Sequence, residues 1–404
     1  MRKVPELRFD GFDREWEEKK LGSLSNVVRG ASPRPISDPK WFDDNSDVGW
    51  LRISDVTAQN GRIHELEQKL SIDGQKKTRV YKTPHLILSI AASVGKPVIN
   101  YMDTGVHDGF LIFEEPKFDL EYLFQWLDSI QLSWSKYGQP GSQVNLNSDI
   151  VKNRRINLPN LKEQEKIGEL FRKIDGLIEI QEGKVSKMED FKKSMLQKMF
   201  PKKGELVPEL RFDGFDGEWE IKKISEIADI IGGGTPSTTK EEYWNGNINW
   251  FSPTEIGNET FYSESLQKIT DLGLSKSSAK LLPKEKTILF TSRATIGNIG
   301  LITEDASTNQ GFQNFVLKNN IDKYFVYSYL QLLNNIFIKF STGSTFKEIS
   351  KKSIETIEMK IPSNKEQAKI GQFFKNLDTQ IENEEKLLDS YKMMKKSLLQ
   401  KMFV

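Results

Sequence analysis

The feature that most constrains the fold is a long helix-forming run that occurs twice. One copy, KEQEKIGELFRKIDGLIEIQEGKVSKMEDFKKSMLQKMF, occupies residues 162–200, and the other, KEQAKIGQFFKNLDTQIENEEKLLDSYKMMKKSLLQKMF, occupies residues 365–403. The copies are offset by 203 residues. A second motif repeats at the same offset, because VPELRFDGFDREWEEKKL at 4–21 returns as VPELRFDGFDGEWEIKKI at 207–224. This period predicts two tandem modules, each with an entry motif, a variable segment and a long helix.

Both runs carry a stripe of seam residues at coiled-coil spacing, three or four positions apart, and the two stripes correspond position by position. The first stripe consists of Ile167, Phe171, Ile174, Ile178, Gln181, Val185 and Met188. The second consists of Ile370, Phe374, Leu377, Ile381, Glu384, Leu388 and Tyr391. Gln181 and Glu384 put a polar residue at the same point of each stripe, which either fixes the register of the helices or marks a splayed, exposed turn.

A lone helix with so large an apolar stripe would be unstable in water, so we expect the two helices to pack against each other. Each would be roughly 58 Å long at about 1.5 Å per residue. Equal module lengths and matching seams favour an antiparallel, pseudo-two-fold pair with one globular domain at each end.

The variable segments predict two mixed α/β domains of related fold. In the first module, short β-rich runs at 49–56, 85–92 and 109–113 alternate with turn-forming clusters. They precede one helical candidate, at 118–137. The second module has the same order with little identity, at 248–257, 286–297, 309–317 and 322–340. We therefore expect an α+β fold: two α/β globular domains separated by two long antiparallel coiled-coil helices.

The repeat also places the domain boundaries. The first domain, with its entry motif, would span residues 1–158, and the central helix 159–203. The second domain, with the repeated entry motif, would span 204–361, and the last helix 362–404.

Composition excludes several classes of protein. The chain has 58 Lys and Arg against 57 Asp and Glu, so any nucleic-acid contact must come from a local basic face. The absence of cysteine excludes disulfides, thiolate zinc sites and a cysteine nucleophile. The first residues lack the apolar core of a signal peptide, and the longest apolar run, 86–94, is too short to cross a bilayer. These features predict a cytoplasmic protein.

Motifs that carry chemistry are missing from the sequence. We find no Asn-Pro-Pro-aromatic or Asp-Pro-Pro-aromatic motif of an adenine methyltransferase, no Walker lysine and no metal-ligand cluster. GGGTPST at 232–238 lacks the spacing of a phosphate-binding loop. His64, His85 and His107 all lie in the first domain without counterparts in the second, so we interpret them as surface or packing residues. The sequence therefore predicts no catalytic and no metal site.

The whole chain resembles the specificity subunits of type I restriction-modification systems. The resemblance rests on the repeated KEQxKIG and SxLQKMF helix ends and the repeated PELRFDGF entry. It also rests on GGGTPST, on WFSPTEIG at 250–257 and on FTSRATIG at 290–297. The first domain departs locally, with RGASPRP at 29–35 and SIAASVG at 89–95 in the corresponding places.

The resemblance implies a non-catalytic subunit that recognises a bipartite sequence in double-stranded DNA. Each domain would read one half through the major groove, while the helices would hold the gap between the halves. Two methyltransferase subunits would bind the repeated regions, and ATP-dependent restriction subunits would join outside them. S-adenosylmethionine, ATP and Mg²⁺ are then expected in the partner subunits and no cofactor in this chain.

DNA contacts would come from turns of the variable domains, where Arg and Lys can bind guanine or phosphate and Asn and Gln can pair with adenine. The candidates in the first domain are Arg34, Lys96, Gln139, Ser142, Gln143 and Asn145. Those in the second are Thr235, Ser237, Arg293, Asn309, Gln310, Ser344, Thr345 and Lys347. Arg293 and the Gly-Ser turns at 141–142 and 343–344 are favoured; for each residue the alternative is a solvated loop side chain.

Three other functions stay open at this point. The complex could methylate DNA without a restriction subunit. The chain could be an enzyme in its own right, in which case it would bind S-adenosylmethionine alone. It could also be a coiled-coil interaction protein, in which case it would lack DNA binding that weakens with salt.

Overall fold

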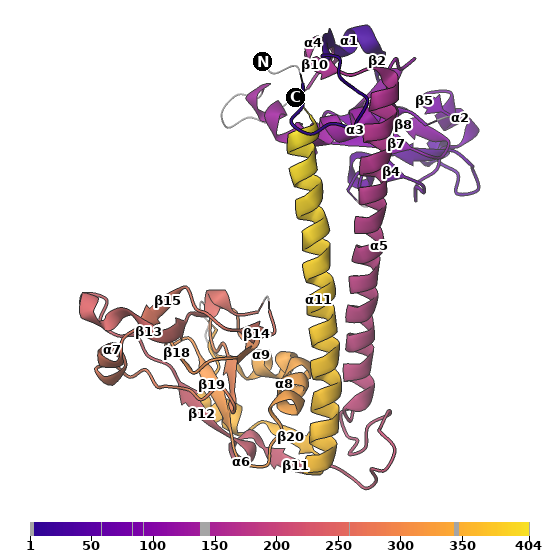
Figure 1. The fold of residues 1–404 in the computed structure, drawn as a ribbon. Helices are drawn as coiled ribbons and strands as arrows, with labels where there is room; N and C mark the ends of the chain where they lie inside the picture. The colour runs from indigo at the N-terminus through magenta and orange to yellow at the C-terminus, as the bar shows by residue number, and fades with distance from the viewer. Residues whose placement is uncertain are drawn as a thin grey trace. The chain divides into compact units, whose positions relative to one another are not determined.

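The computed structural model describes residues 4–57, 59–82, 84–91, 93–137, 146–257, 259–342 and 347–403. The chain forms two compact units. Unit 1 contains residues 1–182 and 387–404, and unit 2 contains residues 183–386. Because the boundaries fall inside the two long helices, each unit holds one variable domain and half of each helix (Figure 1).

Unit 1 contains three sheets and several short helices. Its strands are β1 (Glu17–Lys20), β2 (Asn26–Arg29), β3 (Gly49–Leu51), β4 (Arg62–Ile63), β5 (Arg79–Tyr81), β6 (Leu86–Ser89), β7 (Pro97–Asn100), β8 (Thr104–Val106), β9 (Phe110–Glu114) and β10 (Arg155–Leu158). Its short helices are α1 (Leu21–Leu24), α2 (Ile72–Gln75), α3 (Leu120–Ser129) and α4 (Ser148–Asn153). The sheet orders are β2-β9-β6-β7-β4, β3-β8-β5 and β1-β10.

Unit 2 repeats this plan. Its strands are β11 (Glu220–Lys223), β12 (Ala228–Gly232), β13 (Trp244–Phe251), β14 (Phe261–Tyr262), β15 (Gln267–Ile269), β16 (Thr287–Phe290), β17 (Ile299–Ile302), β18 (Ala306–Thr308), β19 (Gln313–Leu317) and β20 (Glu358–Ile361). Its short helices are α6 (Ile224–Ile227), α7 (Asp271–Ser275), α8 (Lys323–Leu332), α9 (Asn334–Phe340) and α10 (Lys351–Glu355). The sheet orders are β12-β19-β16-β17-β14, β15-β13-β18 and β11-β20.

The two units share one topology. The five-stranded sheets correspond strand for strand. The β6-β7 hairpin lies between β9 and β4, and the β16-β17 hairpin lies between β19 and β14. The three-stranded sheets differ in one edge strand: unit 1 has β5 next to β8, and unit 2 has β15 next to β13. An isolated bridge takes the place of the other edge strand in each unit, Gly49–Lys69 in unit 1 and Leu282–Ala306 in unit 2. The predicted mixed fold with a tandem repeat is therefore confirmed.

The long helices are α5 (Leu161–Met199) and α11 (Asn364–Met402), each of 39 residues. Each begins just after a proline and a polar residue whose side chain accepts the N–H of the first-turn glutamate: Asn160 for Glu163 and Ser363 for Glu366. The helix ends are one residue earlier than predicted. Pro201 follows α5 closely and cannot continue it.

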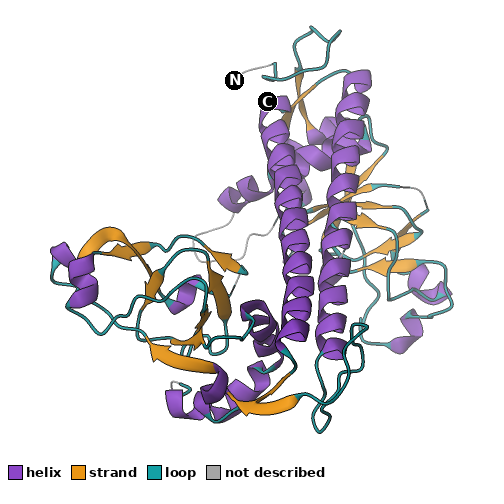
Figure 2. Ribbon diagram, turned by 60° about the horizontal axis from the view of Figure 1, so that its bottom comes forward, coloured by secondary structure: helices purple, strands orange, loops and turns teal. Residues whose placement is uncertain are grey.

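The halves of the two helices run antiparallel within each unit (Figures 1 and 2). In unit 1, Lys395 Nζ lies 2.7 Å from Asp175 Oδ1 and Lys392 Nζ lies 2.7 Å from Glu182 Oε1. Residue numbers thus fall along α11 as they rise along α5, so the helices are antiparallel. Unit 2 has the equivalent pair, Lys192 Nζ to Asp378 Oδ1 at 2.6 Å. Lys192 and Asp378 stand at the repeat positions of Lys395 and Asp175, so the same ion pair fixes the register twice.

Burial would raise the pKa of Asp175, but Lys395 and Arg62 outweigh it and lower that pKa. Arg62 Nη2 lies 2.9 Å from Asp175 Oδ2, and its Nη1 lies 2.6 Å from Glu121 Oε1. In unit 2 the hydroxyl of Tyr324, at the repeat position of Glu121, donates to Asp378 instead. Asp175 in unit 1 and Asp378 in unit 2 thus each bind both the variable domain and a lysine of the other long helix.

The repeated entry motif is explained by one arginine. The Arg8 guanidinium donates two hydrogen bonds to Glu163, at 2.7 and 2.8 Å, and Arg211 donates two to Glu366, both at 2.8 Å. Both glutamates are buried in the first turn of a long helix, where a carboxylate also meets the positive end of the helix dipole. The phenyl rings of the same motif form cation–π contacts with a lysine of α5, because Lys166 Nζ lies over the rings of Phe9 and Phe12.

The KEQxKIG motif supplies two more contacts with the variable domain. Gln164 Oε1 accepts the N–H of Asp119, and Gln367 Oε1 accepts that of Asp322, both at 3.1 Å. A Cβ on Gly168 would lie 2.4 Å from Asp119 Oδ1, so glycine is needed where α5 meets the first residue before α3. Gly371 repeats this close approach in unit 2.

The SxLQKMF endings pack into the other module's domain. In unit 1 the core combines Met402, the last residue of α11, and Phe403, which follows it, with Phe171 of α5 and Tyr122 of α3. In unit 2, Phe200 packs between aromatic rings of α8 and α11, including Phe374. Each domain is thus completed by the end of the helix from the other module.

The predicted seam residues are buried to different degrees. Ile167, Phe171, Ile174, Val185, Ile370, Phe374, Leu377 and Ile381 are buried, whereas Ile178, Met188, Leu388 and Tyr391 are half-buried. The first residues of each stripe pack against the variable domain as well as the other helix. Gln181 is buried, and Glu384 accepts a hydrogen bond from Lys184 at 2.7 Å, so neither polar position is a splayed, exposed turn.

The single helices predicted at 118–137 and 322–340 are wrong. Each divides in two, into α3 and a 3-10 segment (Gln131–Tyr137) in unit 1 and into α8 and α9 in unit 2. The break lets the second piece bury one aromatic side chain, Trp134 or Phe337. A continuous apolar stripe in the sequence concealed this change of direction.

Candidate nucleic-acid interface

In unit 2, four loops that follow strands lie against one another. Gly234, after β12, donates its N–H to Thr308 O at the end of β18 (2.8 Å). Ser292, after β16, donates to Gly311 O (2.8 Å), and its own carbonyl accepts the N–H of Ile349 (3.0 Å). These backbone bonds bring the segments 232–238, 291–297, 308–311 and 347–349 to one surface, which we call loop cluster 2.

Unit 1 has the equivalent loop cluster 1. Ala31, after β2, donates its N–H to Val106 O at the end of β8 (3.0 Å), and Ile90, after β6, donates to Gly109 O (2.9 Å). The segments 29–36, 89–91, 93–95 and 106–109 therefore meet as their counterparts do in unit 2. The predicted correspondence of the turns is confirmed for these described segments.

A polar turn between two strands lies at the centre of each cluster. In unit 1, His107 Nδ1 accepts the N–H of Gly109 at 2.8 Å; in unit 2, Asn309 Oδ1 accepts that of Gly311 at 2.7 Å. The second module thus has no histidine at the place of His107. Asn309 occupies its place and caps the same turn with a different side chain.

The next residue of this turn joins it to the loop after the first strand. Asp108 accepts from Ser32 Oγ (3.0 Å) and from Arg34 Nη2 (2.6 Å). Gln310, its counterpart, accepts a hydrogen bond from Thr235. Burial would raise the pKa of Asp108, but Ser32, His107 and the nearby guanidinium groups outweigh it and lower that pKa. Asp108 is therefore a carboxylate at neutral pH and restrains Arg34.

The predicted contact residues have different surroundings. Gln310, Thr235, Ser237 and Lys347 are exposed, and the Arg34 side chain is 67% exposed although it is ion-paired. Arg293 is half-buried, and among the described residues none forms a hydrogen bond or ion pair with its guanidinium group. Its cation is thus available to a phosphate or a guanine.

Two predicted residues have intramolecular roles. Lys96 Nζ lies 2.6 Å from Asp128 Oδ1, on α3, and its side chain is only 25% exposed. Asn309 holds its own turn, as described above. Gln139, Ser142, Gln143, Asn145, Ser344 and Thr345, with both Gly-Ser turns, lie outside the described residues.

Sequence reasoning missed His107, Asp108, Ser32 and Arg29, all in loop cluster 1. Arg29 donates from Nε to the carbonyl of Asp108 at 2.7 Å. The sequence contained a usable indication, because HDGF at 107–110 aligns with NQGF at 309–312, where two candidates had been chosen.

Neither a metal centre nor a membrane span is found in the part of the chain that the structure describes. There, no group of three or more His, Cys, Asp or Glu side chains is placed to hold a metal ion. None of the described helices combines the length and the apolarity needed to cross a bilayer.

The chain is similar to proteins of known class. It is 37% identical over 173 residues to the type I restriction enzyme MjaIX specificity subunit of Methanocaldococcus jannaschii, covering 42% of this chain and 40% of that protein. It is 29% identical over 170 residues to the EcoR124I/EcoR124II specificity subunit of Escherichia coli, covering 41% and 42%. The chain thus spans about two fifths of the length of these relatives.

A solved structure shares the fold over almost the whole chain. The S subunit of a type I restriction-modification system from M. genitalium superposes with a TM-score of 0.65 at 16% identity, covering 99% of both chains. The family model described as the type I restriction modification DNA specificity domain matches residues 13–190 and 216–391, one match for each module. The chain belongs to the type I restriction-modification DNA specificity family.

Proposed function

We propose that this chain is the sequence-specific DNA-recognition subunit of a type I restriction-modification complex, and that each variable domain reads one half of a bipartite duplex target. The observation that carries the proposal is the pair of loop clusters. The clusters share two backbone bonds, while the side chains at equivalent positions differ: His107 and Asn309, Asp108 and Gln310. A common scaffold with different polar groups suits two different base sequences.

The partners follow from the duplicated parts. The entry motif and the long helix carry nearly the same residues in both modules, and equal surfaces bind equal partners. We infer that two methyltransferase subunits bind there and carry S-adenosylmethionine, with ATP-dependent restriction subunits outside them. This chain would then contribute recognition and assembly, and the other subunits the chemistry, in the cytoplasm.

The long helices are proposed to set the gap between the half-sites. Both cross from one unit into the other, and their register is fixed by an ion pair in each unit. A gap of fixed length requires such a constraint, because two domains on a flexible linker would accept many spacings.

The test is an exchange of residues 225–360 for the corresponding segment of another family member. The full chain is assembled with its methyltransferase partner, and bound duplexes are selected from a randomised pool at two salt concentrations. We expect a bipartite sequence in which the exchange alters one half and leaves the other half and the gap unchanged. Selection of no sequence, or a change in both halves, would contradict the proposal.

A further inference from the structure

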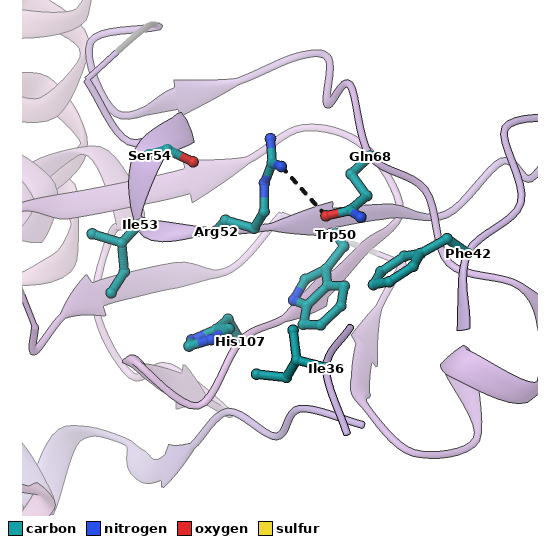
Figure 3. A pocket seen from close by; sticks show the side chains of 8 residues that line it. All are labelled: Ile36, Phe42, Trp50, Arg52, Ile53, Ser54, Gln68 and His107. Atoms are coloured by element: carbon teal, nitrogen blue, oxygen red, sulfur yellow. Dashed lines mark hydrogen bonds between the residues drawn. The ribbon is translucent and has the colours of Figure 1, made fainter. Parts of the chain in front are cut away.

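A cavity of about 320 Å³ opens in unit 1 beside loop cluster 1 (Figure 3). Ile36 and Ile53 give it apolar walls, and Phe42 and Trp50 give it aromatic ones. Arg52, Ser54, Gln68 and His107 supply its polar groups. Small-molecule sites have this volume and this mixture of apolar walls with a few polar groups.

The cavity is continuous with the candidate interface. Ile36 directly follows the 29–35 segment, and His107 belongs to the turn that joins this segment through Asp108. A DNA strand bound at loop cluster 1 would therefore pass its opening.

The aromatic residues form a stack. The rings of Phe42 and Trp50 are 5.0 Å apart at 18°, and those of Trp50 and His107 are 6.0 Å apart at 29°. Figure 3 draws the Trp50 indole between Phe42 and the His107 side of the cavity. Phe42 and His107 thus cover the faces of Trp50, while their own half-buried rings line the cavity. Such rings are a favourable surface for another flat ring, and bases stack on aromatic residues irrespective of sequence.

Trp50 also has an unmet hydrogen-bond requirement. Its Nε1 is buried and has no partner among the described residues, although the side chain is only 1% exposed. The equivalent Trp250 donates its Nε1 hydrogen to Gly234 O at 2.8 Å. A buried donor without an acceptor is unfavourable, and the described residues of unit 1 do not supply the acceptor that the loop supplies in unit 2.

The charges in the cavity favour a neutral occupant. Arg52 binds Asp55 with two groups, Nη2 to Oδ1 at 3.0 Å and Nε to Oδ2 at 3.2 Å, so its charge is already compensated. Its Nη1 reaches Gln68 Oε1 at 3.4 Å. A phosphate would meet no free cation here, whereas a ring with carbonyl oxygens would meet several N–H donors.

His107 adds one of these donors. Burial lowers its pKa below the ordinary value, so the imidazole is neutral at neutral pH. Nδ1 lies 2.8 Å from Gly109 N and 3.1 Å from Asp108 Oδ1. Because it accepts the shorter bond, from the Gly109 N–H, we assign the ring proton to Nε2, which donates.

We propose that this cavity takes a single carbonyl-bearing base, thymine or guanine, turned out of the stack of the DNA half-site that the first domain reads. A paired base presents only an edge, so a ring must leave the helix to lie against aromatic faces. The inference rests on the proposed DNA-recognition function and names a base-binding site within it.

The test uses the full chain assembled with its methyltransferase partner and its selected duplex. Because 2-aminopurine has no carbonyl oxygen, it is placed beside each thymine and guanine in turn and not in place of it. In the wild type, fluorescence should rise where a base leaves the stack in the first domain's half-site. Trp50→Phe keeps an aromatic ring but removes the N–H. It should abolish that rise and weaken binding by about fivefold to tenfold, the loss of one hydrogen bond.

Two further variants make the test decisive. Trp219→Phe removes another buried, unpartnered indole N–H, in the core of unit 2, and should change neither the rise nor the affinity. Gln68→Leu keeps the volume of a half-buried side chain and should weaken the rise even if Trp50→Phe fails to fold.

The outcomes are separable. Equal fluorescence and affinity in wild type, Trp50→Phe and Gln68→Leu would overturn the base site while leaving DNA recognition intact. Normal DNA binding with lost methyltransferase assembly would overturn it in favour of a protein segment in the cavity. If the wild type selects no sequence, the proposed function itself fails.

Discussion

Replacing Arg8 by methionine should destabilise unit 1 by leaving a buried carboxylate without its cation. Arg8 binds Glu163 through two hydrogen bonds, and the glutamate side chain is 0% exposed. Removing one partner of a buried pair costs about 3 to 5 kcal/mol, and the helix N-terminus offsets about 1 kcal/mol of this. We expect a loss of about 3 kcal/mol.

The measurement is thermal unfolding. For a unit of about 200 residues, this loss should lower Tm by about 6 to 12 °C. Arg155→Met is the matched control, because Arg155 pairs with Glu18 at the surface, with side chains 64% and 40% exposed. It should cost less than about 1 kcal/mol. The double variant Arg8→Met with Glu163→Gln should recover part of the loss, since no charge is then stranded.

Two results would refute this reasoning. If Arg8→Met and Arg155→Met lower Tm equally, burial of the pair does not matter. If the double variant is no more stable than Arg8→Met, the cost is lost packing and not a stranded charge. Arg211→Met should repeat the effect in unit 2, because Arg211 and Glu366 form the same pair.

Three other perturbations have definite expected results. In a denaturant titration, Gly168→Ala should lower the unfolding free energy by about 1 to 3 kcal/mol, because the new Cβ clashes with the α3 cap. Gly176→Ala, with nothing within 4 Å of its Cβ, should raise the unfolding free energy by about 0.5 to 1 kcal/mol. Burial lowers the pKa of His107 below its ordinary 6.5, so the contribution of the neutral imidazole to the unfolding free energy should be complete above about pH 6.5 and be lost as the pH falls through the folded pKa. His107→Asn, which introduces the residue of the second module, should remove this pH dependence when unfolding is measured from pH 5 to 8. An unchanged dependence of the unfolding free energy on pH would contradict the assignment. Inserting seven residues into both α5 and α11 at the unit boundary adds about 10 Å and should widen the selected gap by roughly three base pairs, while an unchanged gap would exclude the helices as the spacer.

Local and repeated features could be predicted from the sequence. The helices α5 and α11 followed from apolar spacing and from a motif that recurs unchanged, and the β6 and β16 strands from short apolar runs between turn residues. These features are encoded by neighbouring residues, so no knowledge of the tertiary fold was needed.

Long-range partners could not be predicted. Lys395 meets Asp175 across 220 positions of sequence, and nothing in the charged pattern distinguishes these two residues from the solvated charges around them. The same applies to Lys96, whose pairing with Asp128 depends on where α3 packs. An exposed loop lysine and a lysine that binds its own domain look alike in a sequence.

The site itself was predicted as a set of loops but not as chemistry. The turns that form loop cluster 2 were identified by comparison with the first module, and Thr235 and Gln310 do meet there. His107 and Asp108 were missed although HDGF aligns with NQGF, because a histidine and an aspartate do not resemble the asparagine and glutamine whose places in the turn they take.

The measurement that tests the central claim most directly is a genome-wide map of methylated adenines in cells that express this chain with its methyltransferase partner, compared with cells that lack the chain. The proposal predicts a bipartite motif with a fixed gap that appears only when the chain is present, and one altered half when residues 225–360 are exchanged. A methylation pattern that is the same with and without the chain would contradict it.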